Sequence, residues 1–313
     1  MPRNIPSRTD EFYTPLSAIE QELIYYRDFL KGKVVYCNCD DWRRSNFVKY
    51  FLDNFSSIGL KGLVSTCYNR DGNGLWMRFD GETKTDGLLN GSGDFRSGEC
   101  LKILNDCDIV VTNPPFSIFM DLLQVMKSFP SRDFLVLGMI SSVVSRAGIS
   151  MLTSGKLFLG KSIHCGDVKF IVPDEYELRA NTCGIDEEGK RFIHVTGVRW
   201  FTSVRELAND PPPLDLSAKF DSERYRSYDC SSSVLNVDKV KDIPADYYGW
   251  MGVPVTFLDK WNREQFHIAD GFSYRYYLDP LHLNQYIAGD MLATSIDGKP
   301  RYARLLIRRK VTI

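Results

Sequence analysis

The residues best suited to chemistry in this 313-residue chain are Asn113-Pro114-Pro115-Phe116, which directly follow the apolar run 108–112. An asparagine side-chain oxygen and the carbonyl of the next proline can each accept one N–H of a conjugated amine. Two such acceptors favour a more tetrahedral nitrogen whose lone pair points at an electrophile. Because proline fixes its own φ and restricts the backbone dihedral angles of the residue before it, the backbone of 113–115 should be rigid at the end of a strand. These residues therefore predict group transfer to an amine, such as the exocyclic amine of adenine.

Phe116 adds an aromatic face beside these acceptors. An adenine cannot be reached inside a duplex, so enzymes that modify it flip it out, and stacking contributes roughly 1–3 kcal/mol per base. The alternative interpretation is structural, with Pro-Pro ending a strand and Asn113 serving as a turn residue. The strand-like run before the motif favours catalysis.

The elements that must position this motif follow from the spacing of apolar residues. Helices are expected over 16–30, from the N-cap Ser45 to before Gly59, over 99–105 and over 118–129, and strands over 34–37, 63–66, 108–112 and 134–138. The glycine-rich stretch 71–98 is expected to hold turns and loops. Alternating strands and helices indicate an α/β fold with a parallel sheet. Ligands bind at the carboxyl ends of such strands, where 37–40 and 113–116 would both lie.

The second half of the chain has a different sequence pattern, in which strand-like runs and polar stretches replace the alternation of strands and helices. Strand-like runs cover 168–172 and 192–201, a Pro-rich polar stretch covers 206–246, and Asp297-Gly298 predicts a tight turn from which 302–308 runs back as a strand. We expect a core over 1–172 and a second region over 173–313, which can also complete the core sheet.

Composition narrows the class of protein. The chain is 43% hydrophobic and 25% charged, and it lacks the roughly 18 continuous apolar residues of a membrane span, so a globular, cytoplasmic protein without a membrane partner is expected. Its eight cysteines lack zinc-site spacing, so we expect no metal. The net charge of -1 gives no support to nucleic-acid binding, because proteins that bind nucleic acids usually carry an excess of basic residues. The basic segment 301–310 can either contact the phosphates of a nucleic acid or form a strand edge that is exposed to solvent.

The motifs, in their order, resemble those of the N6-adenine DNA methyltransferases, and most closely the branch typified by the EcoRI modification methylase. The segment 11–15 (Glu-Phe-Tyr-Thr-Pro) looks like the N-terminal cofactor motif, and 36–41 followed by 45–47 looks like the first cofactor loop of that branch. The segment 93–97 (Gly-Asp-Phe-Arg-Ser) stands where the cofactor's adenine is contacted. The resemblance covers Glu11 to Val172 and continues more weakly through 197–202.

This resemblance implies a Rossmann-like class I S-adenosylmethionine-dependent methyltransferase core with a C-terminal, β-rich target-recognition region. It implies duplex DNA as the partner, S-adenosylmethionine as the methyl donor and a monomer as the working form. The implied catalytic residues are Asn113, Pro114, Pro115 and Phe116. The implied cofactor-binding residues are Tyr13, Thr14, Pro15, Cys37, Asn38, Asp40, Asp94 and Phe95.

Two departures from the usual pattern stand out. The first loop, 37–40, has no glycine, and Cys67-Tyr68-Asn69 stands where an acidic residue usually holds the ribose hydroxyls. Asp40, an implied cofactor-binding residue, could alternatively serve only as a cap of the following helix. Two other functions stay open: the same chemistry applied to an RNA adenine or a protein glutamine, and a DNA-binding protein without catalysis.

Overall fold

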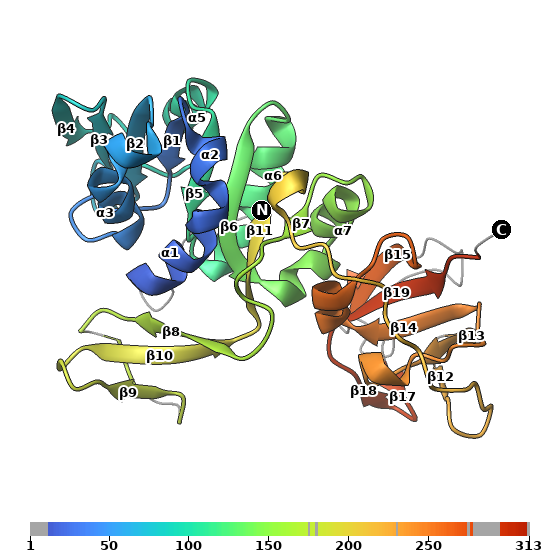
Figure 1. The fold of residues 1–313 in the computed structure, drawn as a ribbon. Coiled ribbons are helices and arrows are strands. Elements are labelled where there is room, and N and C mark those ends of the chain that lie inside the picture. The colour runs from blue at the N-terminus through green and yellow to red at the C-terminus, as the bar shows by residue number, and fades with distance from the viewer. Residues whose placement is uncertain are drawn as a thin grey trace. The chain divides into compact units, whose positions relative to one another are not determined.

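The computed structural model describes residues 12–174, 176–178, 181–229, 231–273, 276–277 and 295–311 (Figure 1). It is a mixed α/β structure with a large central sheet. The chain forms two compact units, the first from Met1–Met139 and Phe158–Ala208, the second from Ile140–Leu157 and Asn209–Ile313. The expected boundary at 172/173 therefore falls within the first unit, because strands beyond it pair with that unit's sheets.

The central sheet of the first unit has the strand order β4-β3-β2-β1-β5-β6-β11-β7. Its parallel centre is formed by β1 (Val34–Cys37), β2 (Gly62–Cys67), β5 (Ile109–Thr112) and β6 (Asp133–Met139). Antiparallel pairing adds β3 (Leu75–Phe79), β4 (Lys84–Leu88), β11 (Val198–Thr202) and β7 (Phe158–Leu159). The sheet is thus mixed rather than purely parallel. β11, which lies beyond residue 172, pairs antiparallel with β6 in this sheet.

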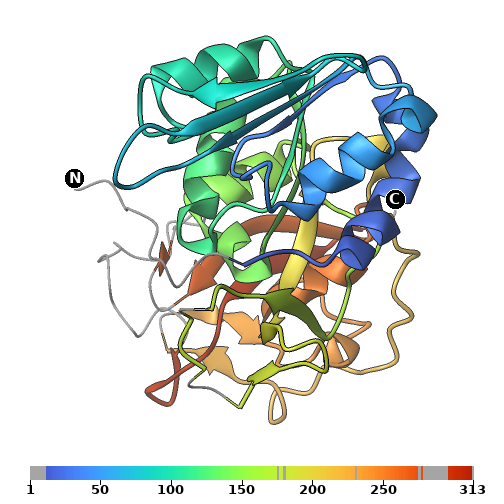
Figure 2. The ribbon, with the colours of Figure 1, turned by 90° about the vertical axis from the view of Figure 1, so that its left-hand side faces the viewer.

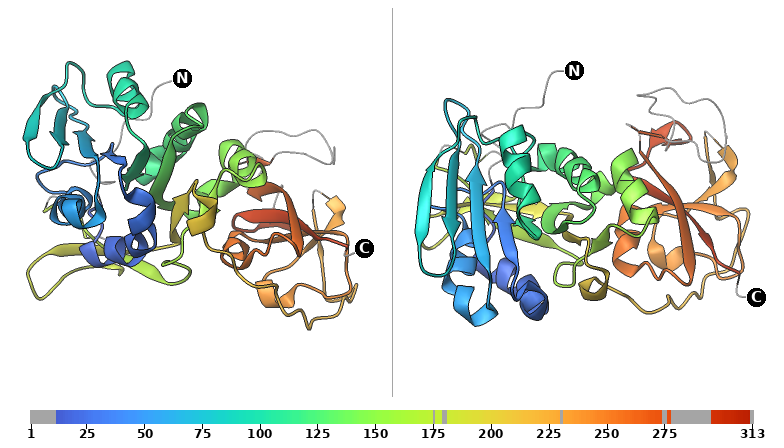
Figure 3. Two further views of the ribbon diagram at one scale, coloured as in Figure 1. Left: turned by 45° about the horizontal axis from the view of Figure 1, so that its top comes forward. Right: turned by 90° about the horizontal axis from the view of Figure 1, so that it is seen from above.

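Helices cover both faces of this sheet (Figure 3). They are α1 (Leu16–Leu23), the 3-10 helix η2 (Ile24–Tyr26), α2 (Arg27–Leu30), α3 (Asn46–Asp53), α4 (Phe55–Ile58), α5 (Gly98–Asn105), η3 (Phe116–Ile118), α6 (Phe119–Ser128) and η5 (Arg205–Leu207). Alternate strand residues such as Val35, Val111 and Leu135 share one core with α1 and α3. On the other face, the Phe119 ring of α6 packs against Phe201 of β11.

Most predicted elements of this unit are confirmed, with one correction. The glycine-rich stretch 71–98, expected to be turns and loops, contains the hairpin β3–β4. In β4 no residue is fully buried, so the strand is held by its ladder with β3 rather than by an apolar face. Hydrophobic patterning therefore gives no signal for it.

A separate three-stranded sheet also belongs to the first unit, with the order β8-β10-β9 (Figure 2). Its strands are β8 (Asp167–Ile171), β9 (Cys183–Ile185) and β10 (Arg191–Thr196). The predicted run 192–201 is thus divided between two sheets. Gly197 has a φ of 83°, a left-handed conformation that separates β10 from β11.

The second unit is built on a six-stranded sheet with the order β12-β13-β14-β19-β15-β16. Its elements are η4 (Ile140–Val144), α7 (Arg146–Thr153), β12 (Ser227–Tyr228), β13 (Ser231–Asn236), η6 (Val240–Asp242), β14 (Trp250–Pro254), η7 (Val255–Lys260), β15 (Phe266–Ser273), β16 (Tyr276–Tyr277), β17 (Ser295–Ile296), β18 (Lys299–Pro300) and β19 (Arg304–Arg309). Among the described residues, no helix could span a membrane.

The terminal hairpin was predicted correctly at its turn but not in its pairing. Asp297 and Gly298 have φ values of 53° and 70°, as a tight turn of this type requires, and β17 pairs with β18. The later strand, β19, does not run back along this hairpin. It pairs with β14 and β15 instead, which places it inside the six-stranded sheet.

Gly138 on β6 lets α6 approach the sheet closely, since a Cβ at this position would overlap the Phe119 ring. Replacing Gly138 by alanine is expected to lower the free energy of unfolding by about 1–3 kcal/mol, as over-packed cores do. Urea denaturation measures this change. In the control variant, Gly98→Ala, the added methyl group meets nothing within 4 Å and the midpoint should not fall. Equal midpoints for the two variants would contradict so close a contact.

Candidate functional site

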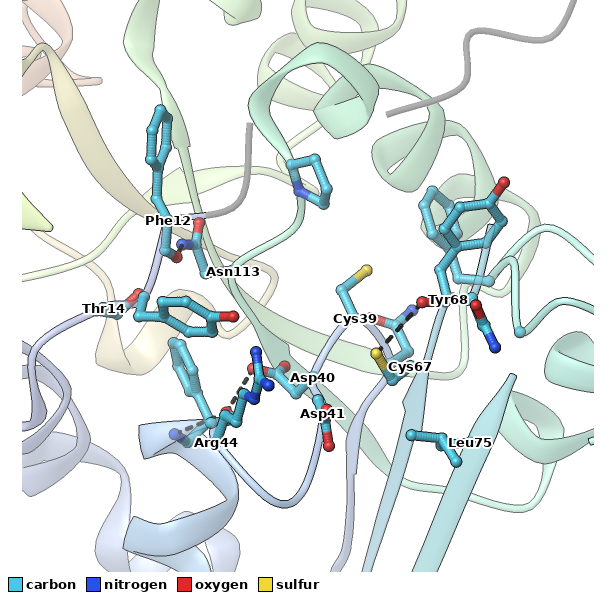
Figure 4. Close-up of a pocket in the computed structure, with 18 of the residues that line it drawn as sticks. Phe12, Thr14, Cys39, Asp40, Asp41, Arg44, Cys67, Tyr68, Leu75 and Asn113 are labelled. Atoms are coloured by element: carbon cyan, nitrogen blue, oxygen red, sulfur yellow. Dashed lines mark hydrogen bonds between the residues drawn. The ribbon is translucent and has the colours of Figure 1, made fainter. Parts of the chain in front are cut away.

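A cavity of about 450 Å³ lies where the carboxyl ends of β1, β2 and β5 meet (Figure 4). Residues from the segments 12–14, 38–47, 67–69, 93–96 and 113–118 line it. β2 and β5 flank β1 on opposite sides, so the chain reverses its direction across the sheet here. Open α/β sheets bind ligands at such switch points, and the volume suits a small organic molecule.

Most of the predicted site residues meet in this cavity. Those that line it are Tyr13, Thr14, Asn38, Asp40, Asp94, Phe95, Asn113 and Pro115. Pro15, Cys37, Pro114 and Phe116 do not. Pro15 precedes α1 as its N-cap residue, and Cys37 is fully buried in the core that β1 shares with α1 and α3.

Asn113 offers one free acceptor. Its Nδ2 donates to the Phe12 carbonyl oxygen at 2.8 Å. A carbonyl can only accept, so this bond fixes which end of the amide is nitrogen. The side-chain oxygen, Oδ1, is buried and has no partner. An unpaired buried acceptor is costly, so this atom is well suited to a ligand's N–H.

Phe116 is half-buried and packs against other aromatic rings. Its centroid lies 5.5 Å from that of Phe12 and 6.0 Å from that of Phe170. These contacts explain why the ring does not line the cavity. Its neighbour Pro114 is buried at the strand end, while Pro115 reaches the cavity.

The Asp40 carboxylate joins two elements of the site. Ser45 Oγ donates to Oδ1 at 2.6 Å, and Thr112 Oγ1 at the end of β5 donates to Oδ2 at 2.5 Å. Burial raises the pKa of Asp40 to about 6, although the two hydroxyls stabilise its charged form. Asp40 does not cap the next helix. Ser45 does, accepting from the backbone of Phe47 and Val48, as its predicted N-cap role requires.

Two more buried acceptors are without partners at the cavity, Thr14 Oγ1 and Asn38 Oδ1. The segment that carries Thr14 is tied to α3, because Asn46 Nδ2 donates to the Thr14 carbonyl at 2.8 Å. With Asn113 Oδ1, three unpaired acceptors therefore belong to residues of one cavity. All three oxygens can accept a hydrogen bond, and the Thr14 hydroxyl can also donate one.

Arg96 lines the cavity, although the sequence motifs predicted a role only for its neighbours Asp94 and Phe95. Its Nε and Nη2 donate to the Asp94 carboxylate at 2.9 and 2.8 Å, and its Nη1 donates to Asp121 in the first turn of α6. It thereby links the segment 93–96 to the helix that follows 113–116. The Asp-x-Arg spacing of 94 and 96 is the sequence signal that could have indicated this pair.

Two further features of the cavity wall come from charge and burial. Burial tends to raise the pKa of Asp41, but hydrogen bonds from Arg43 outweigh it and hold that pKa below its usual range. Burial also raises the pKa of the Cys39 thiol well above its usual range, so this group stays protonated. Within the described ranges, no three His, Cys, Asp or Glu side chains gather around a possible metal position.

Known proteins resemble this chain along most of its length. The chain is 38% identical to the Type II methyltransferase M.EcoRI of Escherichia coli, with 97% of this chain and 94% of the relative covered. It is 34% identical to M.MpnI of Mycoplasma pneumoniae, covering 98% and 97%, and 32% identical to a Type II methyltransferase of Mycoplasma genitalium, covering 97% and 96%. No solved structure matches.

The family model described as "Adenine-specific methyltransferase EcoRI" matches residues 2–310, a range that includes every residue of the cavity. The match extends through both compact units. This chain therefore belongs to the EcoRI family of adenine-specific methyltransferases.

Proposed function

We propose that this protein transfers a methyl group from S-adenosylmethionine to N6 of a flipped adenine at a specific site in duplex DNA. Family membership supports the reaction and the substrate. The observation that carries the assignment is the buried, unpaired Oδ1 of Asn113 at the cavity where three parallel strands end. An acceptor held there can orient an amine.

We assign the central sheet and its helices to a Rossmann-like class I methyltransferase core. The parallel order β2-β1-β5-β6, with helices on both faces and a switch point beside β1, supports this assignment. We assign the second unit, which carries a six-stranded sheet of its own, to target recognition.

The cavity suits S-adenosylmethionine. The molecule carries an ammonium group and ribose hydroxyls, all of them donors, and the unpaired acceptors Thr14 Oγ1 and Asn38 Oδ1 can receive them. The Asp40 carboxylate adds negative charge, and the buried Phe95 ring offers an apolar wall for an adenine. When bound, the cofactor supplies an electrophilic methyl group on sulfur.

The roles of the chain's own residues follow from their atoms. Asn113 Oδ1 and the Pro114 carbonyl each accept one N–H of the target amine, so that the nitrogen lone pair points at the methyl group. Pro114 and Pro115 keep the two acceptors at a fixed separation. Phe116, whose half-buried ring packs beside the cavity, keeps its proposed role of stacking on the flipped base with the part of the ring that stays exposed. Transfer is direct, without a covalent enzyme intermediate.

We propose that the face of the second unit that carries Arg308 contacts DNA. Arg308 of β19 is exposed and stacks over the Trp250 ring, 4.8 Å from its centroid. His267 pairs with Arg308 across the sheet and lies beside Trp250. Burial and then the charges of Arg308 and Lys310 lower the pKa of His267, so at neutral pH those two cations supply the positive charge.

Replacing Asn113 by alanine should abolish methyl transfer while cofactor binding is kept. The change removes the acceptor for the amine and the hydrogen bond to the Phe12 carbonyl, but it leaves the proposed cofactor acceptors of Thr14 and Asn38 in place. Labelled S-adenosylmethionine, unmethylated duplex DNA and nucleoside analysis of the product measure this. N6-methyladenine is the expected product of the wild type and of Asn105→Ala, a change on the exposed end of α5. Label that enters RNA or protein instead of DNA would exclude duplex DNA as the substrate.

Cofactor affinity should depend on pH through Asp40, whose pKa burial raises to about 6. A bound ammonium group favours the carboxylate, so below pH 6 binding must expel a proton, and the affinity falls by up to about tenfold per pH unit. Above pH 6 the proton is already gone and the dependence ends. Calorimetry between pH 5 and 7 measures this. Asp40→Asn should bind weakly at every pH, and a pH-independent wild type would contradict the role.

Replacing Arg308 by alanine should weaken DNA binding and reduce the slope of log affinity against log salt by about one, since one phosphate contact is lost. Cofactor affinity should not change. The matched control is Arg224→Ala in the same unit, where Asp242 at 3.1 Å already neutralises the charge. Fluorescence anisotropy at several salt concentrations measures both variants. Equal slopes in the two variants would remove Arg308 from the DNA-binding face.

A further inference from the structure

Phe12 lies between the three-stranded sheet and the asparagine of the site. Its carbonyl oxygen accepts the 2.8 Å hydrogen bond from Asn113 Nδ2. The next residue, Tyr13, is bridged to β8, donating from its N to the Ile171 carbonyl at 2.8 Å and accepting from Ile171 N at 3.1 Å. The backbone that holds Asn113 is therefore itself held by β8.

The side chain of Phe12 is held as well. Its ring centroid lies 5.5 Å from that of Phe116, 5.7 Å from that of Phe170 and 6.1 Å from that of Tyr176. Phe170, on β8, is fully buried and also contacts Phe116 at 6.0 Å. These four rings form one cluster beside Asn113 (the Phe12 cluster: Phe12, Phe116, Phe170, Tyr176).

An asparagine amide is not oriented by its own torsion, because its terminal rotation has two nearly equivalent settings half a turn apart. In one setting the oxygen faces the ligand, and in the other the NH₂ group does. A target amine offers only N–H groups, so an exposed NH₂ group would place donor against donor. An acceptor behind the amide selects the productive setting, and the Phe12 carbonyl is such an acceptor.

We propose that Phe12 is a positioning residue for methyl transfer: its carbonyl sets the orientation of the Asn113 amide, and the Phe12 cluster with β8 keeps that carbonyl in place. This inference rests on the proposed function, because it gives Asn113 Oδ1 the role of amine acceptor. It assigns to the small sheet β8-β10-β9 a part in the chemistry, carried through the bridge at Tyr13 and Ile171.

The first test separates positioning from binding. Phe12→Ala should lower the single-turnover rate of transfer, at saturating cofactor and DNA, by roughly a hundredfold, the usual effect of a small misplacement. Phe12→Leu, which keeps most of the apolar volume, should recover most of that rate. The matched control is Phe192→Leu, on β10 of the same sheet, whose ring contacts His194 and Lys169 rather than the cluster. This control should keep the wild-type rate.

Calorimetry and thermal unfolding accompany the rates, because Phe12 also lines the cavity. The proposal expects cofactor affinity, KM for DNA and Tm of Phe12→Leu and Phe12→Ala to stay near those of the wild type while the rate of Phe12→Ala falls. A wild-type single-turnover rate in Phe12→Ala overturns it. So does a loss confined to cofactor affinity or KM, since that loss indicates a wall of the cavity and no more.

The second test uses the carbonyl itself. In Asn113→Asp a carboxylate has no N–H for the Phe12 carbonyl, whereas the protonated acid can donate its O–H there and still present an oxygen to the amine. The rate of this variant divided by the wild-type rate should therefore rise as pH falls from 8 to 5.5. The ratio cancels the effect of Asp40, which both proteins share.

A ratio that is flat across this range, including one that is zero throughout, overturns the role of the Phe12 carbonyl. Failure of the proposed function looks different. If Asn113→Ala still makes N6-methyladenine at the wild-type rate, Asn113 is not the acceptor and the assignment of the reaction to this motif fails. If Asn113→Ala is inactive while the Phe12 variants and the Asn113→Asp ratio show no effect, only the positioning inference fails.

Discussion

The site depends on one buried residue, Asp40, whose carboxylate and backbone together join the ends of three strands. Asp40 follows β1, accepts from Thr112 at the end of β5, and through its backbone bonds β2: its N donates to the Thr66 carbonyl at 3.0 Å and its carbonyl accepts from Ser65 Oγ at 2.5 Å. Taking a charge out of water is costly unless hydrogen bonds replace the solvent, and here two hydroxyls do so. These bonds hold the loop that follows β1 to the ends of β2 and β5.

The polar groups of the cavity fall into two sets. Asp40, Asp41 and Asp94 have their carboxylates engaged by hydroxyls or by arginine, and so they shape the walls. Thr14, Asn38 and Asn113 each keep a buried oxygen without a partner. Because the first set is satisfied within the protein, the second set keeps oxygens that can accept hydrogen bonds from a ligand.

Much of the core could be predicted from local pattern. Apolar runs identified the four central strands, and Ser45 and Gly59 marked the ends of one helical region. The predictions that failed concern strands that are defined by their pairing partners. β4 is held by its ladder with β3 rather than by burial. β19 pairs with β14 and β15 instead of the nearby hairpin. A sequence records the period of a strand but not its partner.

The site shows the same limit on a smaller scale. Strand order predicted that Asn38 and Asn113 share one edge, since parallel strands end on the same edge, and the family resemblance added Tyr13 and Asp94; all four line one cavity. The sequence could not show that the Cys37 side chain is fully buried in the core shared with α1 and α3. Nor could it show that the amide of Asn113 donates to a carbonyl 101 residues earlier in the chain.

The absence of glycine from the first loop also has a physical explanation. None of residues 38–45 has a positive φ, so the turn needs no residue with glycine's freedom. The turn is closed by backbone bonds to the Asp41 carbonyl from Arg44 and Ser45, at 2.9 and 2.8 Å. Side chains therefore stand where a glycine-rich loop would expose backbone. Within this loop, the buried side-chain oxygen of Asn38 has no partner and belongs to a residue that lines the cavity.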